Sequence, residues 1–110
     1  VVKFIGDAVM YIAHDALAAV NVAQGLIRAA QVRGMQARAG VAVGEVLALQ
    51  GDYFGPVVNL AARLVSMAGP GEVFVTDEVA QRVGGVVETD ALGARAVRGF
   101  SHEIEVARLR

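Results

Sequence analysis

One stretch of this chain, from Asp15 to Arg33, has apolar residues at helical spacing, and strand-like runs lie on both sides of it. The apolar positions recur at alternating steps of four and three residues: Ala16, Val20, Ala23, Ile27 and Ala30. That spacing places them along one side of a helix, where they can be buried together. Asp15 is positioned to cap the start of this helix, and Gly34 to end it.

A second helix is predicted from Pro56 to about Met67, because proline suits the first turn of a helix. The "GPG" sequence at 69–71 ends it. The strand-like run "EVFVT" then leads to Thr76, which can cap a short third helix with two acidic residues in its first turn. The apolar stripe of the second helix consists of Val57, Ala61, Leu64 and Ala68.

The remaining apolar runs are short and typical of strands. "VVKFI" and "AVMYIA" flank Gly6-Asp7, a pair that suits a hairpin turn with glycine first. "ARAGVAV" and "EVLAL" meet at Gly44-Glu45, "QGDYFGP" is predicted as a loop, and "RAVRGFSHEIEVARL" as a hairpin or closing strand pair. Hairpins that alternate with helices predict an α+β fold, with a largely antiparallel sheet covered by helices on one face.

Composition excludes several classes of function. The 110 residues, 55% of them hydrophobic, fit one domain at most with a modest core. A formal net charge of -1 gives no cationic excess for binding nucleic acid. The chain has no cysteine, which excludes disulfides and thiolate metal sites and fits a cytoplasmic domain. No apolar run is long enough to span a bilayer, and whether the parent protein is membrane-attached stays open.

The second helix carries the most informative polar residues. Asn59 and Arg63 lie one turn apart, roughly opposite the apolar stripe, so both can point at one ligand. An ordinary exposed polar face is the usual explanation of such a pair on its own, but this face is sparsely charged and the helix follows the glycine-rich loop that holds Asp52. Asp52 lies in the preceding glycine-rich loop, and Asp7 lies in the predicted hairpin turn, where turn chemistry alone accounts for an aspartate.

Three segments, in this order, resemble the class III nucleotidyl cyclase catalytic domain, close to the bacterial adenylate cyclases: "VVKFIGDAVM", "GVAVGEVLALQGDYFGPVVNLAARL" and "VRGF". The resemblance covers nearly the whole chain. Its most specific part is "DYFGPVVNLAAR", which joins a loop carboxylate to an Asn-x-x-x-Arg helix. The resemblance implies a ferredoxin-like or palm-like fold that converts ATP to cyclic AMP and pyrophosphate for intracellular signalling.

The resemblance implies binding roles for four residues. Asp7 matches the second of two metal-binding aspartates, and a complete site would hold two Mg²⁺ or Mn²⁺ ions, which hard oxygen ligands suit. Lys3 and Asp52 match the pair that reads the adenine edge. Arg98, in "VRGF", matches a basic contact to the triphosphate.

Two further residues match the catalytic positions of the family. Asn59 resembles the residue that orients the ribose, and Arg63 the one that stabilises charge on the reacting phosphate. Cyclisation needs the ribose 3′-hydroxyl to attack the α-phosphate in line while pyrophosphate leaves. A guanidinium near that phosphate offsets the charge that grows during transfer, and two metal ions activate the hydroxyl.

One part of the family pattern has no match here. The strand that carries the first metal aspartate, in a motif like "DIxGFT", and the helices after it are missing. We therefore expect residues 1–110 to be the C-terminal portion of a single, N-terminally truncated cyclase catalytic domain that is inactive by itself.

The resemblance also implies an assembly. Class III cyclases work as dimers with composite active sites at the interface, and this chain carries residues of both halves, as expected of a homodimer. The alternative is a non-catalytic cyclase-like domain with a regulatory or dimerisation role. The enzyme is favoured because a purely structural module has no need of Lys3, Asp7, Asp52, Asn59 and Arg63 together.

Overall fold

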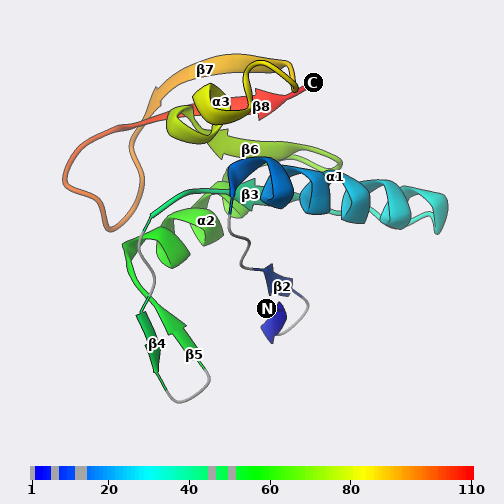
Figure 1. Cartoon of the computed structure of the whole chain (residues 1–110), viewed down its shortest axis with the longest axis horizontal. Helices are drawn as coiled ribbons and strands as arrows, with labels where there is room; N and C mark the ends of the chain where they lie inside the picture. Colours follow the sequence, from blue (N-terminus) through cyan, green and yellow to red (C-terminus); the bar gives the residue numbers. More distant parts are fainter. Residues whose placement is uncertain (1, 6–7, 12–14, 45–46, 50–51) are drawn as a thin grey trace.

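The central sheet of this computed structural model contains four strands (Figure 1). Across the sheet they are β3 (Ala39–Val41), β6 (Val73–Thr76), β8 (Ile104–Leu109) and β7 (Thr89–Arg95). β3 and β6 run parallel, whereas the other neighbouring pairs are antiparallel, so the predicted α+β fold with a largely antiparallel sheet is confirmed. The structure describes the backbone of residues 2–5, 8–11, 15–44, 47–49 and 52–110, and the side chains of 15–44 and 55–110.

In the described part of the chain, two further pairs of antiparallel strands lie outside this sheet. β1 (Val2–Ile5) and β2 (Ala8–Tyr11) pair antiparallel, as predicted, although their connection lies outside the described residues. β4 (Leu47–Leu49) pairs with β5 (Asp52–Phe54). The strand β5 corrects the prediction of a loop at this position. The glycines of "QGDYFGP" bound the segment, and the two aromatic residues between them favour a strand once a partner is available.

All three predicted helices are confirmed: α1 (Ala16–Val32), α2 (Pro56–Met67) and α3 (Asp77–Val83). The Asp15 carboxylate accepts a hydrogen bond of 2.7 Å from the Ala18 backbone N–H, which fixes the start of α1. Gly34 follows the end of α1 with a φ of 74°, a left-handed conformation that favours glycine. Among the described residues, no helix combines the length and the apolar character needed to cross a membrane.

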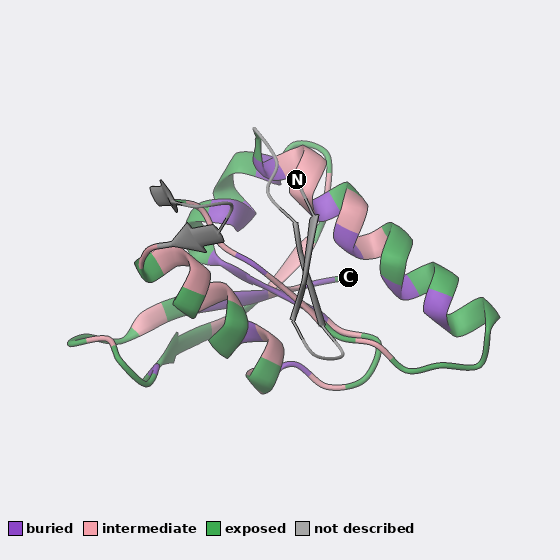
Figure 2. Ribbon diagram, turned by 90° about the horizontal axis from the view of Figure 1, so that it is seen from below, coloured by how far each residue is buried: buried purple, intermediate pink, exposed green. Residues whose placement is uncertain are grey.

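The helices cover both faces of the sheet. α1 and α3 pack on one face, where Val20 and Val79 meet Val75. α2 packs on the other face, where Leu64 meets Phe74 and Val106. Figure 2 shows the strands running between the long helix α1 on one side and α2 on the other.

The prediction of helices on one face therefore holds for α1 and α3 but not for α2. Successive residues of a strand point to opposite faces, and all four residues of β6 are buried. Both faces of β6 are covered, as is usual for a strand in parallel pairing, and α2 supplies the second layer.

A group of charged side chains ties the strand ends together. The Arg108 guanidinium donates to Glu72 at 3.2 Å and to Asp90 at 3.5 Å, and Arg110 donates to Asp90 at 2.7 Å. The pKa of Glu72 is lowered, first by a hydrogen bond from the Gly69 backbone N–H and then by Arg108. The pKa of Asp90 is lowered mainly by the hydrogen bond from Arg110.

Candidate functional site

α2 presents its two candidate catalytic residues to solvent and its apolar stripe to the sheet. Leu64 and Ala68 are buried, whereas Asn59 and Arg63 are exposed. The sequence prediction of an apolar stripe with this polar pair opposite it is therefore confirmed. Because the two residues lie one turn apart on a regular helix, their spacing is set by α2 itself.

The start of α2 depends on Gly55 and Pro56. Gly55 has a φ of 147° and a ψ of 160°, a backbone conformation that only glycine adopts readily. Pro56 occupies the first turn, where its missing N–H costs no helix hydrogen bond. The Gly55 carbonyl accepts a hydrogen bond of 3.1 Å from the Val58 N–H, so the first turn forms immediately after the glycine.

Two glycines allow α2 to lie unusually close to β3 and the residues after it. A Cβ added to Gly40 would lie 2.6 Å from the Ala61 carbonyl oxygen and 2.7 Å from the Leu64 Cβ. A Cβ added to Gly44 would lie 2.9 Å from the Val57 Cβ. Sequence reasoning did not single out Gly40, and it placed Gly44 only at the junction of two strand-like runs. The available signal at Gly40 was a glycine inside an apolar strand run, which marks a close approach of another chain segment.

The segment that carries Arg98 lies beside the first half of α2. Phe100 forms part of an apolar hollow of about 390 Å³, together with Pro56, Val57 and Leu60. Arg98 itself is exposed, and the neighbouring Val97 is buried. Arg98 thus lies two residues before Phe100, on a connection that reaches the start of the helix carrying Asn59.

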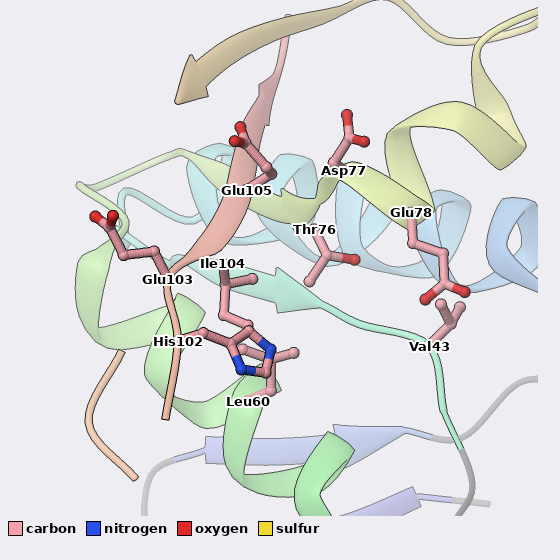
Figure 3. Close-up of a pocket in the computed structure, with 9 residues that line it drawn as sticks. All are labelled: Val43, Leu60, Thr76, Asp77, Glu78, His102, Glu103, Ile104 and Glu105. Atoms are coloured by element: carbon pink, nitrogen blue, oxygen red, sulfur yellow. The ribbon is translucent and has the colours of Figure 1, made fainter. Parts of the chain in front are cut away.

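A second hollow, of about 250 Å³, lies between Leu60 of α2, the start of α3 and the residues entering β8 (Figure 3). Four carboxylates line it, and Figure 3 shows them spread around the hollow without converging on one point. This acidic lining would repel the triphosphate of a nucleotide. The four residues are Asp77, Glu78, Glu103 and Glu105.

Three of the candidate binding residues lie partly or wholly outside the described part of the chain. Lys3 lies in β1 opposite Met10, and Asp52 lies in β5 opposite Leu49, but the side chains of both lie outside the described residues. Asp7 lies wholly outside them. In the described part of the chain, no three His, Asp or Glu side chains are grouped to hold a metal ion. The described side chains therefore do not form a metal site, and the metal prediction rests on Asp7.

Comparison with known proteins decides the family. The model of the adenylate and guanylate cyclase catalytic domain matches residues 2–108. This chain belongs to that cyclase family. The predicted resemblance to class III nucleotidyl cyclases is thereby confirmed over nearly the whole chain.

Two relatives of this cyclase-family chain are named as adenylate cyclases. A pH-sensitive adenylate cyclase of Mycobacterium tuberculosis is 34% identical over 116 residues, covering 99% of this chain and 29% of that protein. An adenylate cyclase of Streptomyces griseus is 39% identical over 111 residues, covering 96% of this chain and 28% of that protein. The chain thus spans less than a third of either curated relative.

The fold also matches a solved structure. The crystal structure of an adenylate/guanylate cyclase/hydrolase from Silicibacter pomeroyi is similar with a TM-score of 0.83 at 29% sequence identity. The match covers 97% of this chain and 69% of that one. The mixed arrangement of a four-stranded sheet with helices is therefore that of a cyclase catalytic domain.

Proposed function

We propose that this chain is part of an adenylate cyclase domain, which converts ATP to cyclic AMP and pyrophosphate. The observation that carries the proposal is the exposed pair Asn59 and Arg63, one turn apart on a helix buried along its opposite side. Family membership gives the reaction class, and the two named relatives are adenylate cyclases.

The proposed chemistry is one in-line displacement at phosphorus. The ribose 3′-oxygen forms a bond to the α-phosphorus and loses its proton, while the bond from that phosphorus to the bridging oxygen breaks and pyrophosphate leaves. Asn59 would orient the ribose so that the 3′-oxygen faces the phosphorus. Arg63 would place a permanent positive charge near the α-phosphate, where negative charge grows in the transition state.

Substrate recognition in this proposal comes from other elements. Lys3 and Asp52 would offer one donor and one acceptor to the ring nitrogen and amino group of adenine, a pattern that guanine reverses. Arg98 would contact the triphosphate from the connection beside α2. Two Mg²⁺ or Mn²⁺ ions, with Asp7 as a ligand, stay an expectation from the family, because the described side chains form no metal site.

The proposed assembly is a homodimer with composite active sites, in which residues 1–110 are the C-terminal portion of each catalytic domain. The limited coverage of the relatives supports a larger functional protein. The domain would act in the cytoplasm, where ATP is available.

The test measures cyclic AMP formation from Mn²⁺-ATP by the full-length protein, with GTP as a competing substrate. Arg63→Ala should reduce turnover about a hundredfold or more, because a typical oxyanion-type contact contributes about 3 kcal/mol. The matched control is Arg82→Ala, which removes an exposed arginine that pairs with Glu78 within α3. This control should retain normal turnover.

Two results would contradict the proposal in different ways. Faster turnover of GTP than of ATP would overturn the assignment of Lys3 and Asp52 to adenine. A folded, dimeric full-length protein that makes no cyclic AMP would favour the alternative, a non-catalytic cyclase-like domain with a regulatory or dimerisation role.

A further inference from the structure

We propose that Gly40 is a positioning residue for the proposed cyclase reaction. Its lack of a side chain lets α2 approach β3 closely, and this approach sets where Asn59 and Arg63 lie. The inference rests on the proposed function, and it assigns a role to a glycine that contacts no substrate.

The sheet determines which way position 40 faces. Gly40 pairs with Phe74 in the parallel β3–β6 ladder, and its neighbours Ala39 and Val41 pair with Val73 and Val75. Ala39 and Val41 belong to the core on the α1 side, so alternation along the strand turns Gly40 toward α2. A side chain at position 40 would therefore be directed at α2.

The contact cannot be relieved by a change of rotamer. Of the three atoms nearest the added Cβ, two belong to the backbone, the Ala61 carbonyl oxygen at 2.6 Å and the Val65 nitrogen at 2.9 Å. The third is the Leu64 Cβ at 2.7 Å, which is bonded directly to the backbone. An alanine at position 40 would thus force α2 and β3 apart until these distances reach the ordinary contact range of 3.4–4 Å.

This displacement would act where the proposed catalytic arginine lies. Ala61, Leu64 and Val65 surround Arg63 in the same regular helix, so a shift of their backbone would carry Arg63 with it. A misplacement of about 1 Å at a reacting group can cost about a hundredfold in rate. Lys3 and Asp52, the proposed adenine contacts, lie in β1 and β5, so binding of ATP should change less than turnover.

The experiment compares Gly40→Ala, Arg63→Ala and the double variant in the full-length protein, with cyclic AMP formation measured over a range of ATP concentrations. Gly40→Ala should lower kcat about a hundredfold and change KM less than about threefold. In the double variant, Arg63→Ala should cost clearly less than in the wild-type background, because the arginine is already displaced.

The double variant separates positioning from mere loss of folded protein. A smaller folded fraction would multiply the activities of both backgrounds by the same factor, so the two substitutions would act independently. The matched control is Gly85→Ala, since a Cβ at that position meets nothing within 4 Å. This control should behave like the wild type.

Each outcome decides the inference. Independent effects of the two substitutions, or a fully active Gly40→Ala, would overturn it while leaving the proposed function intact. A wild-type protein without cyclase activity would overturn both. If Gly40→Ala does not fold, Gly44→Ala repeats the test at Val57, where the clash is milder. A failure of both variants to fold would assign these glycines to stability alone and overturn the inference.

Discussion

Asp15 illustrates how a single side chain determines where an element begins. The first turn of a helix leaves backbone N–H groups without partners inside the helix, and the Asp15 carboxylate accepts one of them from Ala18. Thr76 does the same for α3, where its hydroxyl accepts from the Val79 N–H at 3.4 Å. Both caps were predicted from residue type and position alone, because capping is a local interaction between neighbours in sequence.

The prediction at this scale concerns Asp15→Ala. This substitution removes the acceptor and should lower the free energy of unfolding by about 1 kcal/mol. Urea unfolding followed by circular dichroism measures the change. Asp15→Asn, which keeps an acceptor oxygen at the same place, should stay close to the wild type, and an equal loss in both variants would show that the cap is not the cause.

At the scale of elements, α2 connects stability to the candidate site. Its buried side rests on Phe74 and Val106, and its exposed side carries the residues proposed for catalysis. The apolar stripe and the polar pair were predictable because the spacing of apolar residues in the sequence shows the helical periodicity. The face of the sheet that α2 covers was not predictable, since periodicity does not say against which side of a strand a helix packs.

Other features of the site also depend on contacts between distant residues. A glycine within an apolar strand run, such as Gly40, indicates that another segment of the chain packs closely against it. Only the fold identifies Ala61 and Leu64 as the residues that do so. β5 was missed because its stability comes from pairing with β4, which local turn signals do not report. The roles of all the candidate site residues, Asn59 and Arg63 included, stay predictions from the family resemblance.

The prediction for the α2 layer concerns Leu64, whose side chain is fully buried. Leu64→Ala should lower the free energy of unfolding by about 2–5 kcal/mol, because it removes apolar contacts and leaves a cavity. The matched control is Leu26→Ala on α1, where the side chain is 54% exposed. It should cost about 0.5 kcal/mol or less. Similar losses in urea unfolding for both variants would contradict the packing described for α2.

At the scale of the whole molecule, a charged network joins segments far apart in sequence. Arg108 of β8 bridges Glu72, just before β6, and Asp90 of β7, so three neighbouring strands share one guanidinium. These groups are partly exposed, and solvent screens their interaction. The network still favours one alignment of the strands, because Arg108 reaches both carboxylates only when the three strands are in register.

The network predicts how stability depends on pH. The pKa values of Glu72 and Asp90 are lowered in the folded protein, from ordinary values of 4.5 and 3.8. Their contribution is therefore complete above these ordinary values and is lost as the pH falls through the lowered ones. The free energy of unfolding should decrease on acidification in this range, and high salt should weaken the effect.

Urea unfolding at a series of pH values measures this slope. Glu72→Gln removes one of the two titrating groups, so its stability should fall less steeply with acidification than that of the wild type. Arg108→Met should flatten the slope in the same direction, since it removes the partner that the two carboxylates share. An unchanged slope in both variants would exclude the network as its source.

The place of β8 in the sheet has a consequence for the protein as it is being made. β8 lies between β6 and β7, yet it follows both of them in the chain. A ribosome releases the chain from its beginning, so β6 and β7 emerge without the strand that joins them. Until Ile104–Leu109 has left the exit tunnel, Phe74 and Val75 lack the strand that pairs with them on that side, so this edge of the sheet is open to aggregation during that interval.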